Sequence, residues 1–271
     1  MASSAHLLPG RPTLITLTTD FGTRDSYVAE MKGVLLSTGP SALQLVDLSH
    51  ELPPQDVAHA ARFLEAAVPR FPHGTIHLVV IDPGVGSTRQ ALIASVGGQT
   101  LVLPDNGLIS GLLSQPLHCV AIDPAKLGHV PASSTFHGRD VFAPVAAQLA
   151  NGARPEDFGP PLAHPVALPR PRPIRRDAEL VGALVYKDHF GNLASNITRA
   201  DLQTLGQPLD TLQVRCGAFI GPIRDHYAQV PSGQPLAVLD SQGRLEIAVR
   251  NGNAALALHL ALQTPVTVQR L

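Results

Sequence analysis

The chain has 271 residues, of which 44% are hydrophobic, and its formal net charge at pH 7 is −1. A length and composition of this kind support a large core and favour two domains. A nearly neutral chain lacks the basic field that binding to nucleic acid or to a membrane surface requires. We therefore expect small-molecule partners, with neither nucleic acid nor membrane among them.

The cysteines and the apolar runs bear on the cellular compartment. Cys119 and Cys216 are far apart and form no CxxC motif, which argues against a disulfide framework and favours a reducing environment. Residues 1–12 contain no long apolar segment, and no run of 18 apolar residues occurs. We expect neither a signal peptide nor a transmembrane helix, and a cytoplasmic location.

The first half of the chain alternates apolar runs with helical patterns, which predicts an α/β/α layered domain with a central, mostly parallel sheet. The run 76–81 is continuously apolar, as in a strand buried on both faces. The predicted strands are 14–18, 43–48, 76–81, 91–96, 100–103 and 120–122, and the predicted helices are 26–36, 56–68, 107–113 and 140–150.

A change of composition marks the domain boundary. Residues 151–176 contain seven prolines and little periodicity, which favours an extended connection. We predict an N-terminal domain over 1–155, a linker over 156–176 and a smaller β-barrel-like domain over 177–271. The last has short apolar runs separated by turn residues, with its one helix at 254–262. These runs are 180–186, 211–214, 236–239, 245–249 and 266–268.

Polar residues follow two of the predicted strands directly. Asp20 ends the first strand and Asp82 ends the strand 76–81, and ligands of open α/β sheets bind outside the carboxyl ends of strands. The glycine-rich run 82–87 lacks the lysine of a P-loop and the GxGxxG spacing, so a nucleotide-phosphate site is not indicated. Taken alone, the run is equally typical of a tight turn.

Arg89 and His137 extend this polar set. A carboxylate beside a guanidinium stays ionised, and an imidazole exchanges protons near neutral pH. By itself His137, one of 12 histidines, also fits a hydrogen-bonded loop residue. The histidines form no HExxH or HxH motif, so we expect no metal. The chain has no GxSxG elbow, and both cysteines are expected to be core thiols.

Two polar clusters follow in the C-terminal half. Residues 187–192 and 195–197 combine an acid, an aromatic ring and amides, which suits a ligand with a cation and a flat ring. Residues 240–246 and 251–255 form the second cluster. Each is also typical of a hairpin turn.

Together these motifs resemble one family, the adenosine-forming S-adenosyl-L-methionine (SAM) hydrolases. They are also called SAM hydroxide adenosyltransferases, and the fluorinases and chlorinases are their relatives. The resemblance runs from about Leu14 to the C-terminus, and the order and spacing of the motifs are specific to the family. The motifs are Thr18-Thr19-Asp20-Phe21-Gly22, Asp82-Pro83-Gly84-Val85-Gly86, Pro104-Asp105-Asn106-Gly107, Thr135-Phe136-His137-Gly138-Arg139-Asp140, Phe190-Gly191-Asn192 and Asn251-Gly252-Asn253-Ala254-Ala255.

The resemblance implies displacement at the ribose C5′ carbon by water or hydroxide, with methionine as the leaving group and SAM as substrate rather than cofactor. The catalytic trio would be Asp82, Arg89 and His137. The resemblance further implies substrate contacts to the ribose (Asp20), to the adenine (Phe190 and Asn192) and to the methionine end (Asp188, Asp25 and Ser241). Further substrate contacts are expected at Asp105, Asn106, Phe136, Asn253 and Ala254.

Differences from the halogenating relatives favour water over halide. Those enzymes commonly carry an arginine where Gln242 stands here, and they lack the acid and imidazole that match Asp82 and His137. They also have a long insertion where this chain runs straight through residues 96–99. The alternatives are a halide adenosyltransferase and a non-catalytic SAM or adenosine sensor. The family further implies a homotrimer with the site between subunits.

Overall fold

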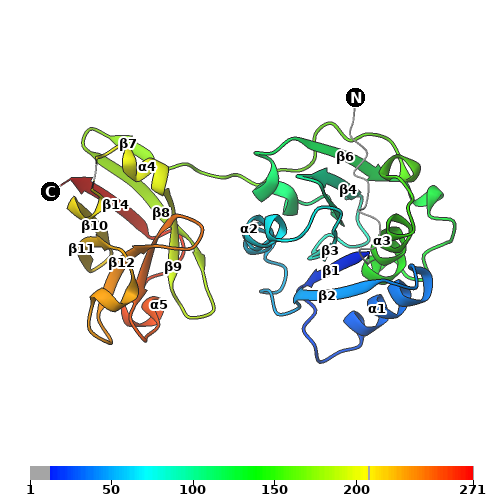
Figure 1. Ribbon diagram of the computed structural model, residues 1–271, viewed down its shortest axis with the longest axis horizontal. Coiled ribbons are helices and arrows are strands. Elements are labelled where there is room, and N and C mark those ends of the chain that lie inside the picture. Colours follow the sequence, from blue (N-terminus) through cyan, green and yellow to red (C-terminus); the bar gives the residue numbers. More distant parts are fainter. Residues whose placement is uncertain (1–12, 207, 271) are drawn as a thin grey trace. The chain divides into compact units, whose positions relative to one another are not determined.

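The computed structural model describes residues 13–206 and 208–270, and the expectation about an apolar leader in residues 1–12 lies outside them. The chain divides into two compact units, Met1–Leu168 and Pro169–Leu271 (Figure 1). This division falls within the proline-rich segment 156–176. Among the described residues, no helix combines the length and the apolar character needed to cross a membrane.

The first unit is built on a six-stranded mixed sheet with the order β2-β1-β3-β5-β4-β6. The pairs β1–β2, β1–β3 and β3–β5 are parallel, whereas β4 is antiparallel to β5 and β6. The mostly parallel sheet is thereby confirmed. The strands are β1 (Leu14–Thr19), β2 (Gln44–Ser49), β3 (Ile76–Val80), β4 (Ala91–Val96), β5 (Gln99–Pro104) and β6 (Leu117–Ile122).

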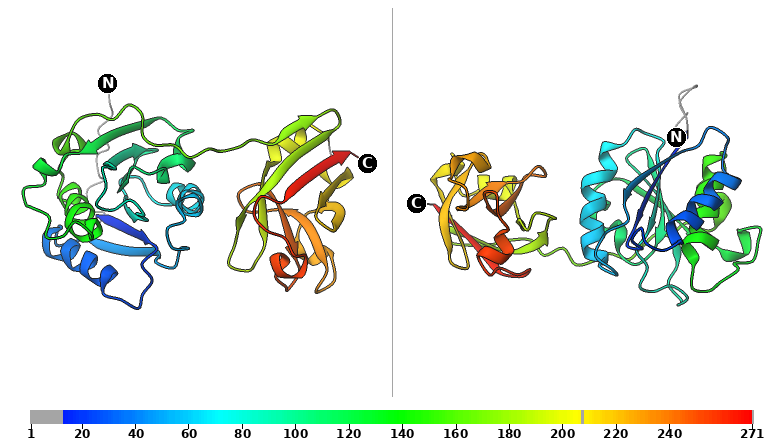
Figure 2. Two further views of the ribbon diagram at one scale, coloured as in Figure 1. Left: turned by 180° about the vertical axis from the view of Figure 1, so that it is seen from behind. Right: turned by 90° about the horizontal axis from the view of Figure 1, so that it is seen from below.

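Helices cover both faces of this sheet, as the two views of Figure 2 show. Helices α1 (Tyr27–Thr38) and α3 (Ala143–Ala150) share one core with alternate side chains of β1 and β3. Helix α2 (Val57–Ala67) packs on the opposite face, and Asp56 caps it by accepting a hydrogen bond from the His59 N–H at 2.8 Å. Phe158, within the segment 156–176, is buried in the core that α1 and α3 share. The predicted three-layer architecture is confirmed.

Two of the predicted helices differ in kind from the expectation. Residues 107–113 do not form an α-helix but a 3-10 turn, Leu108–Leu112, in which Gly111 lies so close to α2 that an added Cβ would be 2.5 Å from the Ala61 carbonyl oxygen. The helix predicted over 140–150 is preceded by a π-helical turn, Gly138–Phe142, and α3 itself begins at Ala143. This wide turn places His137 at its N-terminus.

The second unit is a barrel of seven strands, closed by the pairing of β14 with β8. The short strand β7 pairs with the beginning of β8 and is not one of the seven. Six of the seven junctions are antiparallel, and β11–β12 is parallel. The predicted barrel-like domain is confirmed. The strands are β7 (Ile174–Arg176), β8 (Glu179–Lys187), β9 (Leu193–Thr198), β10 (Leu212–Cys216), β11 (Phe219–Arg224), β12 (Pro235–Leu239), β13 (Arg244–Val249) and β14 (Pro265–Arg270).

Strands β7, β9 and β11 were not predicted, and the single helix predicted over 254–262 is wrong. Helix α5 is confined to Ala254–Ala257, because His259 adopts a positive φ of 51°. A second helix, α4, spans Arg199–Gln203 and is capped by the Thr198 hydroxyl.

A buried histidine in β3 is hydrogen-bonded at both ring nitrogens. Gln99 donates its amide N–H groups to the carbonyls of Val68 and Phe71, so its Oε1 accepts from His77 Nε2 at 2.9 Å. His77 Nδ1 then accepts from the Thr16 hydroxyl at 2.7 Å. The bond from Thr16 needs an unprotonated Nδ1, and burial lowers the pKa of His77 from 6.5 to about 4, although the Gln99 hydrogen bond acts in the opposite direction.

We expect the free energy of unfolding of this unit to fall as pH drops from 6.5 towards 4, since only the unfolded chain takes up the proton in this range. The shift corresponds to a loss of about 3 kcal/mol from His77. Urea unfolding at several pH values measures it. His77→Gln should be less stable than wild type at pH 8, but its free energy of unfolding should change less with pH. His118→Gln, at an exposed position, should retain the pH dependence of the wild type. An unchanged slope in His77→Gln would contradict the assignment.

Candidate active site

A short loop between two strands brings an acid and a guanidinium together. Asp82 lies two residues beyond β3, Arg89 lies two residues before β4, and a tight turn joins them, with Ser87 N donating to the Gly84 carbonyl at 3.1 Å. Gly86 has a φ of +77°, a conformation that glycine adopts without strain. The loop folds back on itself, so both side chains face the same edge of the sheet.

Arg89 connects the three residues of the predicted trio. Its Nε donates to Asp82 Oδ1 at 2.8 Å, and its Nη2 donates both to Asp82 Oδ2 and to His137 Nδ1, the latter at 2.9 Å. The side chains of Arg89 and Asp82 are only 10% and 5% exposed. The guanidinium also lies over the ring of the buried Phe142, at 5.2 Å from its centroid. These contacts hold Arg89 in one orientation.

The same contacts fix the protonation of His137. A guanidinium has only N–H donors, so His137 Nδ1 is the acceptor and the ring proton is on Nε2. Burial, and then the nearby charge of Arg89, lower the pKa of His137 below 6.5, although Asp82 and Asp140 act in the opposite direction. At pH 7 His137 is therefore neutral, with Nε2–H as its free donor.

A cavity of about 680 Å³ borders Arg89 and His137. Four side chains with hydroxyl groups and several apolar side chains also line this cavity. It lies towards the β4 and β6 side of the trio, since its lining includes residues 89–91 and 121–124, whereas Asp20 follows β1 on the other side. The hydroxyls belong to Ser87, Thr88, Ser133 and Ser134.

The remaining predicted residues of the first unit lie along the same sheet edge. Asp20 follows β1 and accepts from the Gln55 N–H at 2.7 Å, while Asp25 is exposed just before α1. Asn106 donates to the Ile81 carbonyl at 2.9 Å and so fixes the backbone next to Asp82. Asp105 is buried, which raises its pKa, and it accepts from the Val166 N–H at 2.8 Å.

Phe136 belongs to an aromatic cluster beside His137. Its ring centroid lies 5.3 Å from that of Tyr27 and 5.9 Å from that of Phe21, in edge-to-face arrangements. The Arg139 guanidinium lies 5.1 Å from the Phe136 centroid. Phe136 is thus packed tightly between α1 and the π-helical turn.

The predicted residues of the second unit form their own group. Asp188 accepts from the backbone and side-chain N–H groups of Asn192 at 2.8 and 3.0 Å. Asn253 caps α5 and lies against Gly191, where an added Cβ would be 2.1 Å from its side chain. Phe190 is 72% exposed beside this group, Ala254 is buried, and Ser241 is exposed in the β12–β13 turn.

Comparison with known proteins shows where the chain belongs. Residues 15–159 match the SAM hydroxide adenosyltransferase N-terminal domain, and residues 182–267 match the C-terminal domain of the same name. The chain belongs to the SAM hydroxide adenosyltransferase family. The two matches correspond in order to the α/β unit and the barrel.

Three named relatives are similar to this chain over most of its length. The (R)-S-adenosyl-L-methionine hydrolase of Thermus thermophilus is 41% identical over 91% of this chain and 96% of its own length. That of Salinispora tropica is 36% identical over 89% and 92%. The fluorinase of Nocardia brasiliensis is 30% identical over 96% and 97%.

Two solved structures share the fold of this chain. A crystal structure of an uncharacterized conserved protein from Thermotoga maritima superposes with a TM-score of 0.85 at 33% identity, covering 94% of this chain and all of that one. A conserved hypothetical protein from Thermus thermophilus gives 0.76 at 37% identity, covering 96% and 100%.

Two buried acids of this SAM hydroxide adenosyltransferase family member, Glu246 and Asp140, had no role among the predicted site residues. Glu246 is buried in β13 and accepts from the Tyr227 hydroxyl at 2.8 Å. Burial raises its pKa to about 7, and the charges of Asp188 and Asp240 add to the effect. Its signal in the sequence is a lone acid within the apolar run 245–249. Asp140, the second acid, lies in the quoted motif beside His137. Among the described residues, no three His, Cys, Asp or Glu side chains group closely enough to hold a metal ion.

Proposed function

We propose that this protein hydrolyses SAM to adenosine and L-methionine by displacement at the ribose C5′ carbon. The observation that carries the proposal is the contact of Asp82, Arg89 and His137 around one guanidinium. Relatives named (R)-S-adenosyl-L-methionine hydrolase support it at up to 41% identity.

The difficult part of this displacement is to supply a good nucleophile, not to release the leaving group. The sulfonium leaves as a neutral thioether, so sulfur needs no general acid. Water is a poor nucleophile and hydroxide is scarce at pH 7, so a site gains most by holding an oxygen anion in line with C5′.

In this site His137 serves as a donor. Its Nδ1 lone pair is taken by Arg89, which leaves Nε2–H to donate to the nucleophile. Arg89 supplies the positive field, and Asp82 holds Arg89 by two hydrogen bonds. Together they favour the hydroxide form of the nucleophile, which reaches them through the cavity beside β4 and β6.

We propose substrate contacts on the pattern that the resemblance implies. We assign Asp20 to the ribose hydroxyls, Asp25, Asp188 and Ser241 to the methionine end, and Phe190 and Asn192 to the adenine. Phe190 offers an exposed ring face and Asn192 an amide fixed by Asp188. Further contacts are proposed for Asp105, Asn106, Phe136, Asn253 and Ala254.

The resemblance also leads us to propose a homotrimer with the site between subunits, a cytoplasmic location, and turnover without a cofactor. A monomer mass in sedimentation, an exported protein in cell fractionation, or a chelator-sensitive activity would each contradict the corresponding part.

Product analysis tests the function. Incubation with SAM, with and without chloride or fluoride, should release adenosine and methionine in equal amounts and form no 5′-halo-adenosine. A halogenated product would support the halide adenosyltransferase. Calorimetric binding of SAM without any product would support the sensor, and either result would contradict hydrolysis.

A further inference from the structure

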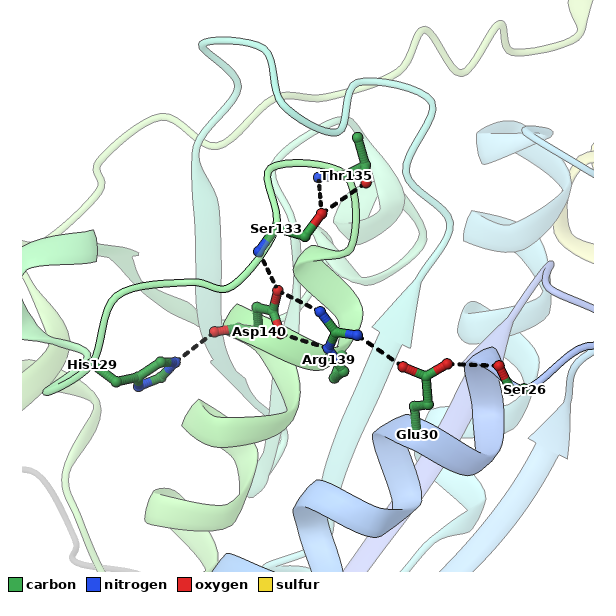
Figure 3. A network of polar contacts seen from close by, with 7 residues as sticks. All are labelled: Ser26, Glu30, His129, Ser133, Thr135, Arg139 and Asp140. Carbon is green, nitrogen blue, oxygen red and sulfur yellow. Dashed lines mark hydrogen bonds and ion pairs between the residues drawn. The ribbon is translucent and has the colours of Figure 1, made fainter.

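A buried carboxylate three residues after His137 is the centre of a polar network (Figure 3). Asp140 Oδ1 accepts from Arg139 Nε at 2.7 Å, and Oδ2 accepts from Arg139 Nη2 at 3.0 Å and from the Ser133 N–H at 2.8 Å. These bonds hold the pKa of Asp140 below its usual value, chiefly through Arg139. The carboxylate is thus ionised and locked in place.

The network joins three segments that are distant in the sequence. Arg139 Nη1 donates to Glu30 Oε2 at 2.9 Å, and Glu30 in turn accepts from the Ser26 hydroxyl at 2.6 Å, at the start of α1. His129 Nε2 lies 2.8 Å from the Asp140 carbonyl oxygen. In Figure 3 these contacts run in one line from the 129–135 loop through the π-helical turn to α1.

The segments that the network fixes are those that surround His137. His137 directly precedes the π-helical turn that carries Arg139 and Asp140, and such wide turns are frequent at functional sites. Ser133 and Ser134 line the cavity together with Arg89 and His137. The loop also abuts the glycine turn, since a Cβ on Gly86 would lie 3.0 Å from the Ser134 carbonyl oxygen.

We propose that Arg139 and Asp140 are positioning residues that hold the His137 imidazole against Arg89 and keep the cavity wall in place beside it. The inference rests on the proposed function, because turnover is one of its readouts. The hydrogen bonds of both residues lead away from the trio: Asp140 accepts from Arg139 and Ser133, and Arg139 donates to Asp140 and Glu30 while its face covers Phe136.

The charges around His137 provide a readout that a purely structural role would not move. Arg89, Asp82 and Asp140 are the charged groups that act on its ring, and Asp140 raises its pKa against the lowering by burial and Arg89. Removing the charge of Asp140 while preserving its shape should therefore shift the titration of His137 to lower pH.

The variant Asp140→Asn tests the proposal. We expect kcat for adenosine formation to fall about ten- to a hundredfold, since a misplacement of about 1 Å at a reacting group costs on the order of a hundredfold, with KM nearly unchanged. The His137 ring titration, followed by NMR on ¹⁵N-labelled protein, should move to lower pH. Asp157→Asn is the matched control, because Asp157 accepts from its own arginine, Arg154, at 2.8 and 3.1 Å but is not one of the residues of the Asp140 network in Figure 3. It should change neither quantity.

The outcomes distinguish failure of the positioning role from failure of the proposed function. An inactive wild type would defeat the proposed function, while the NMR titration would still test the positioning. An active wild type with unchanged kcat and titration in Asp140→Asn would overturn the positioning role. If Asp140→Asn does not fold, Glu30→Gln releases Arg139 from the far end, and wild-type kcat together with an unmoved titration in that variant would equally overturn it.

Discussion

Replacing Arg89 with alanine should lower kcat for adenosine release by about a thousandfold, since it removes the donor that faces both other members of the trio. Without Arg89 the Asp82 carboxylate loses two hydrogen bonds, and His137 Nδ1 loses its fixed donor. The ring then rotates freely, and Nε2–H no longer points in one direction. Steady-state kinetics with SAM, with product separation, measure the loss.

Arg89→Lys should recover little of this activity. A lysine ammonium carries the same charge, but it lacks the planar fork that bonds both Asp82 oxygens and His137 at once. We expect turnover of the lysine variant to stay at least about tenfold below wild type. Full activity in Arg89→Lys would show that charge alone suffices.

A stability control separates lost chemistry from lost folding. Arg89→Ala leaves the Asp82 carboxylate buried and unpaired, which should reduce the free energy of unfolding by about 3 kcal/mol. In the double variant Asp82→Asn with Arg89→Met no buried charge remains, so stability should return to within about 1 kcal/mol of wild type. Turnover should stay low. Restored turnover in the double variant would mean that the pair is structural only.

Several of the strands that the sequence predicted are apolar or β-branched and buried almost throughout. The runs that became β1, β3 and β4 contain hardly any polar residue that a helix or turn would favour. β9 (Leu193–Thr198) and β11 (Phe219–Arg224) contain serine, asparagine, glycine and proline, and pairing with distant strands around the closed barrel creates them. Local patterns carry no information on such pairings.

The residues of the site also fall into a group that local motifs predicted and a group that depends on contacts between distant segments. Asp82, Arg89 and His137 were predicted as a set because two motifs combine acid, guanidinium and imidazole, and the structure brings their side chains together. The network of Asp140 was not predicted, although Asp140 lies in one of these motifs. Its partner Arg139 reaches Glu30, 109 residues away, and only the packing of α1 against the π-helical turn makes that contact.

The pH dependence of turnover distinguishes a donor role of His137 from a base role. Because burial and Arg89 lower the pKa of His137, the neutral ring persists below pH 6.5. When His137 is protonated, its Nδ1–H faces an Arg89 N–H, so two positively charged groups lie in contact and repel each other. Below the lowered pKa of His137, we expect the slope of log kcat against pH to become steeper by about one unit. We expect kcat of His137→Ala to be about a hundredfold below wild type at pH 7.

His137→Gln decides between the two roles, since its amide supplies an N–H donor but does not titrate or act as a base. If Nε2–H holds the nucleophile, the glutamine variant should retain more activity than His137→Ala and lose the acid break in the profile. His118→Gln, at an exposed position, should keep the wild-type break. If the ring is instead the base, glutamine and alanine should be equally inactive. A break that persists in His137→Gln would assign the titration to another group.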